Sequence, residues 1–377
     1  MNTVDIFCTV IDNFGDIGVC WRLAKQLQRE YHLTVRLWVD DLHSFGKLEP
    51  TLSLNLTIQH HQQIEIRHWL VDNFPCDIQP YDVVIEGFGC RLPESFLQAM
   101  VQQTIQPIWL NLDYLSAESW TLDCHGLSST HPTLALKQTF FFPSFDERGG
   151  GLLRENNLLI MRDAFQQDVV AQQHFWQSLA CEQAMLANYR VSLFSYENNA
   201  IPSLLTVLSQ QTQPIFLAIP EGRALTQVST WATKSLTIGD SLTVGSLTLA
   251  ILPFLTPPQY DQLLWACDVN MVRGEDSFIR AHWAARPLLW HIYPQAENAH
   301  LPKLDAWLNT LKTIAPSTPE VYIDIQQAWN RGESSLNFWQ TSWPLLLSTR
   351  PSSELFCHKL SQQPHLAARL IDFCLKQ

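Results

Sequence analysis

Long apolar runs are missing from this sequence. No uninterrupted apolar stretch reaches the roughly 18 residues of a membrane-spanning helix, so we expect none. The first residues also lack the basic segment and apolar core of a secretory signal. Basic residues are few, since 24 Lys and Arg stand against 36 Asp and Glu and give a formal net charge of −12. Because binding to phosphates needs clustered cations, this balance argues against a nucleic-acid-binding protein.

Several sequence patterns for metal and covalent chemistry are missing as well. The nine cysteines are irregularly spaced and contain no C-x-x-C, which predicts buried free thiols in a reducing compartment and a cytoplasmic protein. The thirteen histidines form neither H-E-x-x-H nor a zinc-type spacing with cysteine, so we expect no metal site and no cofactor. A G-x-S-x-G elbow and a Walker A loop do not occur, which argues against serine-hydrolase and P-loop chemistry.

The residues that are present describe a globular chain. Hydrophobic residues make up 46% of it, and fourteen tryptophans argue against disorder. With 377 residues the chain is long enough for two domains that each bury a core. Over roughly the first 150 residues, strand-like segments at 33–39, 81–89 and 107–114 alternate with helical ones such as 93–103. This alternation is typical of a parallel sheet covered by helices.

A second series of strands begins near residue 189. We expect strands at 189–198, 214–220 and 247–254, strand-turn-helix at 269–287, a strand at 287–292, and mostly helices from about Glu297. The simplest architecture is an α/β fold of two Rossmann-like domains facing across a cleft, with ligands at the carboxyl ends of the strands. Between the two series, Pro143 and three glycines break the rhythm of 140–155, as a linker or an active-site loop would.

Two turns that follow strands carry charged side chains. The first, V-I-D-N-F-G-D (10–16), holds Asp12 and Asp16 where a nucleotide-binding turn normally offers glycines to a phosphate. Two carboxylates would repel a diphosphate, so we expect the nucleotide on the second domain and the other substrate at this turn. Carboxylates suit a cationic acceptor, or an acceptor that must lose a proton. The structural alternatives are that Asp16 caps the helix and that Asp12 orients the turn.

The second charged turn, R-G-E-D-S (273–277), joins a strand to a helix. The free N–H groups of the helix N-terminus, with Arg273 and the Ser277 hydroxyl, can hold a diphosphate without a metal. Glu275 can accept hydrogen bonds from the hydroxyls of a sugar. The alternative is structural, with Asp276 or Ser277 as a helix cap and Arg273 paired with a carboxylate.

Aromatic residues stand at two further strand ends. Phe194 and Tyr196 lie in L-F-S-Y-E-N, and Phe254 follows A-I-L-P. A ring at a strand end can stack on a nucleotide base, and Tyr can donate a hydrogen bond to a phosphate. Packing within the core is the alternative for all three.

Five longer segments carry a more specific signal. They are V-I-D-N-F-G-D-I-G-V-C-W-R-L-A (10–24), L-N-L-D-Y-L-S-A-E-S-W (110–120), F-F-F-P-S-F-D-E-R-G-G-G-L-L-R-E (140–155), F-S-Y-E-N (194–198) and L-L-W-A-C-D-V-N-M-V-R-G-E-D-S-F-I-R-A-H-W-A-A-R-P (263–287). Together they resemble the EarP family, the protein-arginine rhamnosyltransferases that modify translation elongation factor P. The resemblance runs nearly from end to end, and its long motifs are far more specific than a single glycine-rich turn.

The resemblance implies a GT-B fold and an inverting glycosyltransferase. The donor would be TDP-β-L-rhamnose, bound mainly by the C-terminal domain, and the acceptor one arginine side chain of elongation factor P. The family's catalytic aspartate falls on Asp16, its first aspartate on Asp12, and its essential glutamate on Glu275. The donor contacts that the resemblance implies are Asn13, Phe14, Gly15, Asp16, Tyr196, Arg273, Gly274, Glu275, Asp276 and Ser277, with Phe194 and Phe254 near the thymine.

One position departs from the family pattern. Relatives place a glutamine shortly after P-F-L, whereas this chain has Pro257 there and Gln259 two residues further on. Whether either residue replaces that donor contact is open.

We expect an N-terminal acceptor and catalytic domain at 1–155, completed by a C-terminal helix at about 355–377, and a nucleotide-sugar-binding domain at 156–354. Two alternative functions remain at this point. One is a GT-B transferase that acts on a small molecule or a lipid, and the other is a nucleotide-sugar-binding protein without catalysis.

Overall fold

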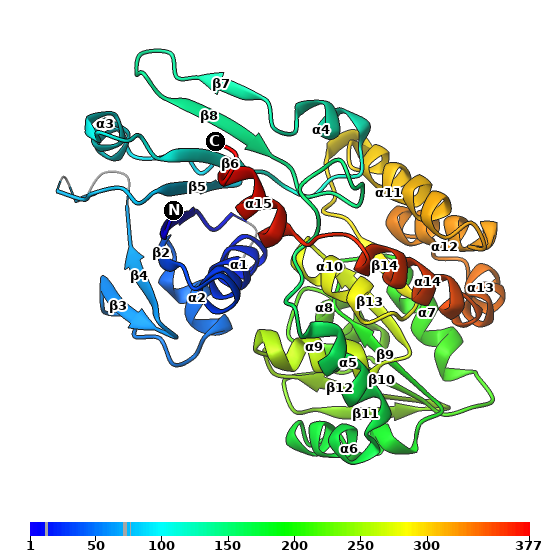
Figure 1. Cartoon of the computed structure of the whole chain (residues 1–377). Helices are drawn as coiled ribbons and strands as arrows, with labels where there is room; N and C mark the ends of the chain where they lie inside the picture. Colours follow the sequence, from blue (N-terminus) through cyan, green and yellow to red (C-terminus); the bar gives the residue numbers. More distant parts are fainter. Residues whose placement is uncertain (12–13, 71–73, 76) are drawn as a thin grey trace. The chain divides into compact units, whose positions relative to one another are not determined.

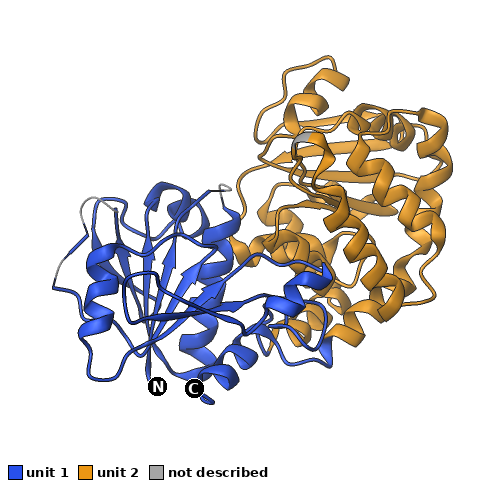
Figure 2. Cartoon of the chain, turned by 90° about the horizontal axis from the view of Figure 1, so that it is seen from above, with its two compact units in different colours: residues 1–156, 361–377 blue, residues 157–360 orange. Residues whose placement is uncertain are grey.

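The chain divides into two compact units. The computed structural model describes residues 1–377 except 12–13, 71–73 and 76. Unit 1 consists of residues 1–156 and 361–377, and unit 2 of residues 157–360 (Figures 1 and 2). Both termini lie in unit 1, so the chain leaves this unit once and returns to it. Within the described part of the chain, we find no helix that combines the length and the apolar character needed to cross a bilayer.

Unit 1 is built on an eight-stranded sheet with the order β3-β4-β2-β1-β5-β6-β8-β7. The strands are β1 (Thr3–Cys8), β2 (Thr34–Val39), β3 (Ile58–His61), β4 (Ile64–His68), β5 (Val83–Gly87), β6 (Ile108–Leu112), β7 (Ser128–Thr130) and β8 (Lys137–Phe141). The six inner strands, in the order β4-β2-β1-β5-β6-β8, pair in parallel. The two edge strands, β3 and β7, pair antiparallel. The order of the parallel strands, 3-2-1-4-5-6 along the chain, is that of a Rossmann fold.

Helices cover the unit 1 sheet and close its core. They are α1 (Gly15–Tyr31), α2 (Leu42–Leu48), α3 (Glu94–Gln102), α4 (Ser119–Cys124) and the C-terminal α15 (Leu366–Cys374), which packs beside α1 (Figure 1). An aromatic cluster fills one side of the core, where Phe7 stacks on Trp38 with ring centroids 5.3 Å apart and meets Trp69 and Phe96 edge-on. Such aromatic contacts add to the stabilisation that burial of the rings provides.

Unit 2 repeats the design with a six-stranded sheet in the order β11-β12-β10-β9-β13-β14. The strands are β9 (Tyr189–Leu193), β10 (Ile215–Pro220), β11 (Ser241–Val244), β12 (Leu247–Leu252), β13 (Val269–Arg273) and β14 (Leu288–His291). Only β11, at the edge, pairs antiparallel among these strands. The parallel order 3-2-1-4-5 puts the topological switch point between β9 and β13, where Rossmann-like sheets bind nucleotides.

The helices of unit 2 follow the same alternation and then form a helical end. They are α5 (Leu158–Gln167), α6 (Val169–Ser178), α7 (Ala200–Ser209), α8 (Leu225–Trp231), α9 (Pro257–Ala266), α10 (Asp276–Trp283), α11 (Leu301–Ile314), α12 (Glu320–Arg331), α13 (Leu336–Ser348) and α14 (Arg350–Ser361). Two 3₁₀ turns lie at Glu182–Leu186 and Ala296–Asn298. The mostly helical region predicted from about Glu297 is confirmed as α11 to α15.

The segment that broke the sequence rhythm is a packed connection inside unit 1. After β8 the chain runs without regular structure to α5 and lies against residues before and at the start of α15. Leu366 N–H donates to the Leu152 carbonyl at 2.9 Å, and Arg154 Nη1 donates to the Ser361 carbonyl at 2.7 Å. Gly151 has a φ of +72°, and a Cβ there would lie 2.6 Å from the Pro364 carbonyl oxygen, so glycine is required.

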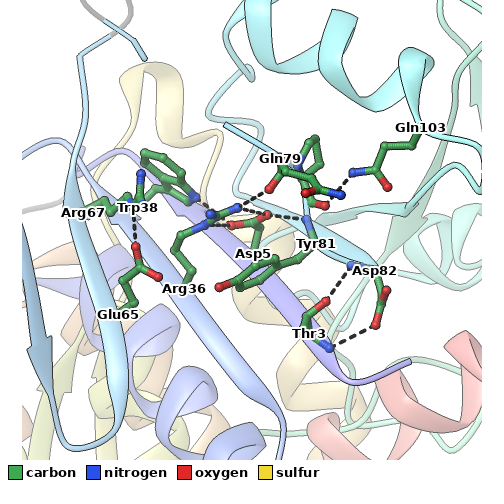
Figure 3. A network of polar contacts seen from close by, with 11 residues as sticks. Thr3, Asp5, Arg36, Trp38, Glu65, Arg67, Gln79, Tyr81, Asp82 and Gln103 are labelled. Carbon is green, nitrogen blue, oxygen red and sulfur yellow. Dashed lines mark hydrogen bonds and ion pairs between the residues drawn. The ribbon is translucent and has the colours of Figure 1, made fainter. Parts of the chain in front are cut away.

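A buried ion pair joins the amino-terminal ends of β1, β2 and β5 (Figure 3). Arg36 donates through Nε and Nη2 to the two carboxylate oxygens of Asp5, at 2.6 and 2.8 Å. Asp5 also accepts from Trp38 Nε1 at 2.8 Å and from Tyr81 N–H at 2.9 Å. The guanidinium lies 4.0 Å from the centroid of the Tyr81 ring and donates to the Gln79 carbonyl. Both charged groups are buried, and each has several hydrogen-bond partners.

Candidate functional site

The carboxyl edge of the unit 1 sheet carries Asp16. Helix α1 has Phe14 as its N-cap residue, so Asp16 is the second residue of the helix and not its cap, and the capping alternative is wrong. The side chain is 2% exposed. One carboxylate oxygen accepts from Ile11 N–H at 2.8 Å, and the other accepts from the Tyr114 hydroxyl at 3.1 Å. The predicted site residues Asp12 and Asn13 lie outside the described residues.

Two aromatic residues that the sequence analysis did not select lie at the same edge. Phe88 follows β5 and Tyr114 follows β6, and their rings stack with centroids 4.5 Å apart and an interplanar angle of 22°. Phe88 has a φ of +56°, in the left-handed region that a bulky residue rarely adopts. The available signal in the sequence was their position at strand ends, and Tyr114 stands within one of the family motifs.

In unit 2, the R-G-E-D-S turn connects β13 to α10. Gly274 has a φ of +64°, and this left-handed residue lets the chain reverse from strand to helix. Glu275 is the N-cap residue but caps through no side-chain hydrogen bond, and Asp276 is the first residue of the helix. The Ser277 hydroxyl donates back to the Arg273 carbonyl. The alternative in which Asp276 or Ser277 caps the helix is therefore wrong, and the first N–H groups of α10 follow Arg273 after only Gly274 and Glu275.

Arg273 is a buried cation held by aromatic rings. Its side chain is 8% exposed, and the guanidinium lies 4.6 Å from the Phe194 centroid and 4.7 Å from the Tyr196 centroid. In the part of the chain that the structure describes, its buried Nη1 has no hydrogen-bond partner. The alternative in which Arg273 is a structural ion pair thus finds no support among these residues. Such an arginine retains donors for an anion.

The remaining aromatic candidates end other strands of the same sheet. Tyr196 is 2% exposed and meets the ring of His291 edge-on, 5.5 Å away, and also that of Tyr293. Phe254 follows β12 and is half-buried. The Gln259 side chain accepts from the N–H and hydroxyl of Thr256 at 3.1 and 2.9 Å, so its oxygen forms part of the N-terminal cap of α9.

Two basic groups beside this site were missed in the sequence analysis. The Arg223 guanidinium, after β10, lies 5.8 Å from the centroid of the Tyr196 ring. His291, at the end of β14, is 4% exposed. Burial, with smaller contributions from His300 and Arg273, lowers the pKa of His291 from 6.5 to about 4, so the imidazole is neutral near pH 7. Their places after parallel strands were the signal that could have identified them.

The carboxyl edges of the two sheets thus differ in charge. Asp16 lies beside the ring of Tyr114 in unit 1. Unit 2 presents Arg273, Arg223 with the Glu197 carboxylate 3.8 Å away, and the N-terminus of α10, which carries Glu275 and Asp276. No cluster of three or more His, Cys, Asp or Glu suited to a metal ion occurs in residues 1–11, 14–70, 74–75 and 77–377. The arrangement can bind an anion on one sheet and a cation on the other.

Comparison with known proteins decides the family. The model of the elongation-factor P (EF-P) rhamnosyltransferase EarP matches residues 4–375. The chain belongs to the EarP family. Membership makes it an enzyme of the glycosyltransferase class. A curated EarP relative, the protein-arginine rhamnosyltransferase of Pseudomonas putida KT2440, is 43% identical over 376 residues and 98% of each chain. The protein of the same name from Shewanella oneidensis MR-1 is 39% identical, over 99% of this chain and 97% of its own.

Solved structures agree with this assignment to the EarP family. One, described as the structural basis for EarP-mediated arginine glycosylation of translation elongation factor EF-P, is 32% identical with a TM-score of 0.71 and full coverage of both chains. MurG of Acinetobacter baumannii shares only 12% identity, with a TM-score of 0.50 over the full length, which supports the fold alone. The fold is that of the GT-B glycosyltransferases, as the sequence predicted.

Proposed function

We propose that this protein transfers L-rhamnose from TDP-β-L-rhamnose to an arginine side chain of elongation factor P, with inversion, in the cytoplasm. The observation that carries the proposal is Arg273, a buried cation with an unused donor at the switch point of a nucleotide-binding sheet. The names of the EarP relatives supply the sugar and the arginine acceptor. The description of the EarP structure supplies the acceptor protein.

The donor would bind unit 2 through its diphosphate. Hydrogen bonds to the phosphate oxygens would come from the first N–H groups of α10, among them that of Ser277, and from the Arg273 guanidinium. Tyr196, Phe194 and Phe254 would contact the nucleotide, and Glu275 would accept from the sugar hydroxyls. When the C–O bond to TDP breaks, negative charge develops on the leaving phosphate, and these donors stabilise it.

The acceptor would meet Asp16. A guanidinium has a pKa of roughly 12.5–13.8, so a carboxylate does not deprotonate it before reaction. Asp16 would instead orient one nitrogen toward the anomeric carbon. As the new C–N bond forms, that nitrogen becomes acidic, and its proton passes to the Asp16 carboxylate while TDP leaves from the opposite face. The role of Asp12 beside it stays a prediction.

This arrangement also predicts turnover without a divalent cation. Arg273 and the α10 N-terminus would neutralise the diphosphate, which is the role that Mg²⁺ takes in many nucleotide-sugar enzymes. We expect the rate in EDTA to equal the rate without it. Activity that disappears in EDTA and returns with Mg²⁺ or Mn²⁺ would assign the carboxylates to a metal instead.

The decisive experiment is intact mass spectrometry of elongation factor P after incubation with the protein and TDP-β-L-rhamnose. We expect a gain of one deoxyhexose, located on an arginine by fragmentation. Release of TDP without this gain would favour a small-molecule or lipid acceptor, and binding of TDP-rhamnose without turnover would favour a protein that only binds the sugar nucleotide.

Asp16→Asn is the matched variant for the mechanism. Asparagine keeps the shape of the side chain but cannot take the proton, so the single-turnover rate should fall by roughly 10²–10⁴, the scale for loss of a positioned base. Its melting temperature should fall only slightly, because the amide oxygen can still accept from one of the two groups that donate to Asp16. A fully active Asp16→Asn protein would end this mechanism.

A further inference from the structure

Three side chains of unit 1 form a connected set at the sheet edge. The Tyr114 hydroxyl donates to Asp16 at 3.1 Å, and the Tyr114 ring stacks on Phe88. Tyr114 is 36% exposed although one of its faces is covered by Phe88. The buried Asp16 carboxylate and a partly exposed aromatic stack therefore lie side by side at this edge of unit 1.

The backbone around Phe88 is held in a strained form. Its φ of +56° is followed by Gly89 at +65°, and Arg91 also has a positive φ of +57°. Phe88 N–H donates to the Leu112 carbonyl at 2.7 Å, and Gly89 N–H donates to the Asn111 side chain at 3.1 Å. Strain of this kind persists only where surrounding contacts fix it, and it concentrates at sites that hold ligands.

Unit 1 already contains one guanidinium held by the same combination of groups. Arg36 lies over the Tyr81 ring at 4.0 Å while the Asp5 carboxylate accepts from its nitrogens (Figure 3). A flat guanidinium gains from stacking on a ring and from a carboxylate at its edge in the same pose. An ammonium group can also lie over a ring, as Lys25 does over Trp21 at 5.1 Å, but it is compact and has no flat face to stack in parallel.

We infer that the Phe88–Tyr114 stack is the surface on which the acceptor's guanidinium lies flat, and that Tyr114 is a positioning residue for Asp16. The ligand class is a planar guanidinium cation on a protein side chain. This inference rests on the proposed function, because it takes the acceptor to be an arginine. The stack selects arginine over lysine, and the Tyr114 hydroxyl fixes the carboxylate that receives the proton.

The stack is tested by binding in the absence of donor, so that no turnover intervenes. Full-length elongation factor P and its acceptor Arg→Lys variant would be titrated against the wild-type chain, Tyr114→Leu and Tyr114→Phe. We expect the wild type to bind the arginine form more tightly by about 2- to 10-fold, less than a whole cation–π contact because an ammonium also gains from lying over a ring. Tyr114→Leu, which removes the exposed ring, should lose most of that preference, and Tyr114→Phe, which keeps the ring, should retain it. Equal preference in Tyr114→Leu and wild type would overturn the stacking role.

The positioning role is tested by Tyr114→Phe, which keeps the ring and removes only the hydroxyl. At saturating acceptor we expect kcat to fall about 10-fold or more, the scale of a hydrogen bond to a charged group, with KM for the acceptor little changed. Tyr31→Phe, at the far end of α1, is the matched loss of a hydroxyl and should leave kcat unchanged. A Tyr114→Phe protein with wild-type kcat, or with a lower melting temperature that accounts for its loss, would contradict positioning.

These outcomes are separable from failure of the proposed function. If wild-type protein adds no deoxyhexose to elongation factor P, the proposed function fails first. If the wild type is active, and both the arginine preference of Tyr114→Leu and the kcat of Tyr114→Phe match it, the transferase assignment stands and only this inference fails.

Discussion

Arg36 and Arg273 are both buried arginines that lie over aromatic rings, yet they differ in their hydrogen-bond partners and in their place along the strand. Arg36 has a bidentate carboxylate, Asp5, and an additional carbonyl acceptor. Arg273 has two rings beside it and a buried Nη1 without a partner among the described residues. Arg36 lies toward the amino end of β2, whereas Arg273 is the last residue of β13.

This difference separates a buried arginine with a structural role from one that can bind a ligand. A buried charge is tolerated when it is paired, and leaving one partner alone is costly. Unit 2 contains its own structural example, since Arg280 donates to both oxygens of Asp261 at 2.8 and 2.7 Å. A buried arginine that lacks such a partner is therefore better explained by an anion that binds from outside the chain.

The largest expected effect comes from breaking the paired arrangement. Asp5→Ala leaves Arg36 buried without its carboxylate, and we expect the free energy of unfolding to fall by about 3–5 kcal/mol in a denaturant titration. Replacing both partners, as Asp5→Leu with Arg36→Met, should recover only part of that loss, because no charge remains buried but Trp38 Nε1–H and Tyr81 N–H lose their acceptor. A loss below about 1 kcal/mol for the single variant would mean that water reaches the pair.

Removing the unpaired cation should have a smaller effect, and on binding instead of folding. Arg273→Met keeps apolar contact with the two rings, so we expect unfolding stability within about 1 kcal/mol of wild type. TDP affinity should drop by about 10- to 100-fold, or roughly 1.5–3 kcal/mol, measured by calorimetry. Asp16→Asn is the control and should bind TDP normally. The opposite ranking of the two variants would indicate that the nucleotide binds unit 1, and it would contradict the ligand-binding role of Arg273.

The smallest expected effect is a pH dependence of folding stability that comes from His291. Its folded pKa of about 4 lies below the unfolded value of 6.5, so folding favours the neutral imidazole. The stability contribution is complete above pH 6.5 and is lost as the pH falls from there toward 4. Between pH 7 and pH 5 we expect about 1–2 kcal/mol less stability through this group, and less pH dependence in His291→Phe. Equal slopes for the two proteins would show that His291 stays hydrated.

The Arg273→Met variant links the two basic groups. Arg273 is one of the charges that lower the pKa of His291, after burial and His300. Its removal should therefore flatten the same pH dependence slightly. An unchanged slope would mean that the cation and the imidazole are shielded from each other.

Much of the fold could be predicted because it depends on local patterns. Segments such as 33–39 and 214–220 alternate with helical stretches, and they form β2 and β10 within parallel sheets. Five short strands were not predicted: β3, β4, β7, β8 and β11. The edge strands β3, β7 and β11 are largely exposed, and β4 and β8 are only partly buried, so their sequences show little apolar periodicity. The alternative in which Asp16 caps α1 was wrong, because the N-cap is Phe14, two positions before this typical capping residue.

The candidate site was predictable only in its outline. Arg273 and Asp16 were selected by charge and by their position after strands, and the structure puts each at the carboxyl edge of a Rossmann-like sheet. The bond between Tyr114 and Asp16 joins residues 98 positions apart, and no local pattern encodes such a contact. The missing partner of Arg273 is likewise a property of the folded surroundings, which sequence spacing does not describe.

The return of the chain to unit 1 sets the order in which the protein can mature on the ribosome. Residues 361–377 supply α15, and His365 reaches Gln26 on α1 at 3.4 Å. Synthesis of the intervening residues of unit 2 takes roughly 10–40 s at ordinary elongation rates. During that time unit 2 can emerge and fold as a continuous segment. The surface of α1 that α15 covers in the complete protein remains exposed to water until residues 361–377 are synthesised. The first unit to be translated is thus the last to be completed.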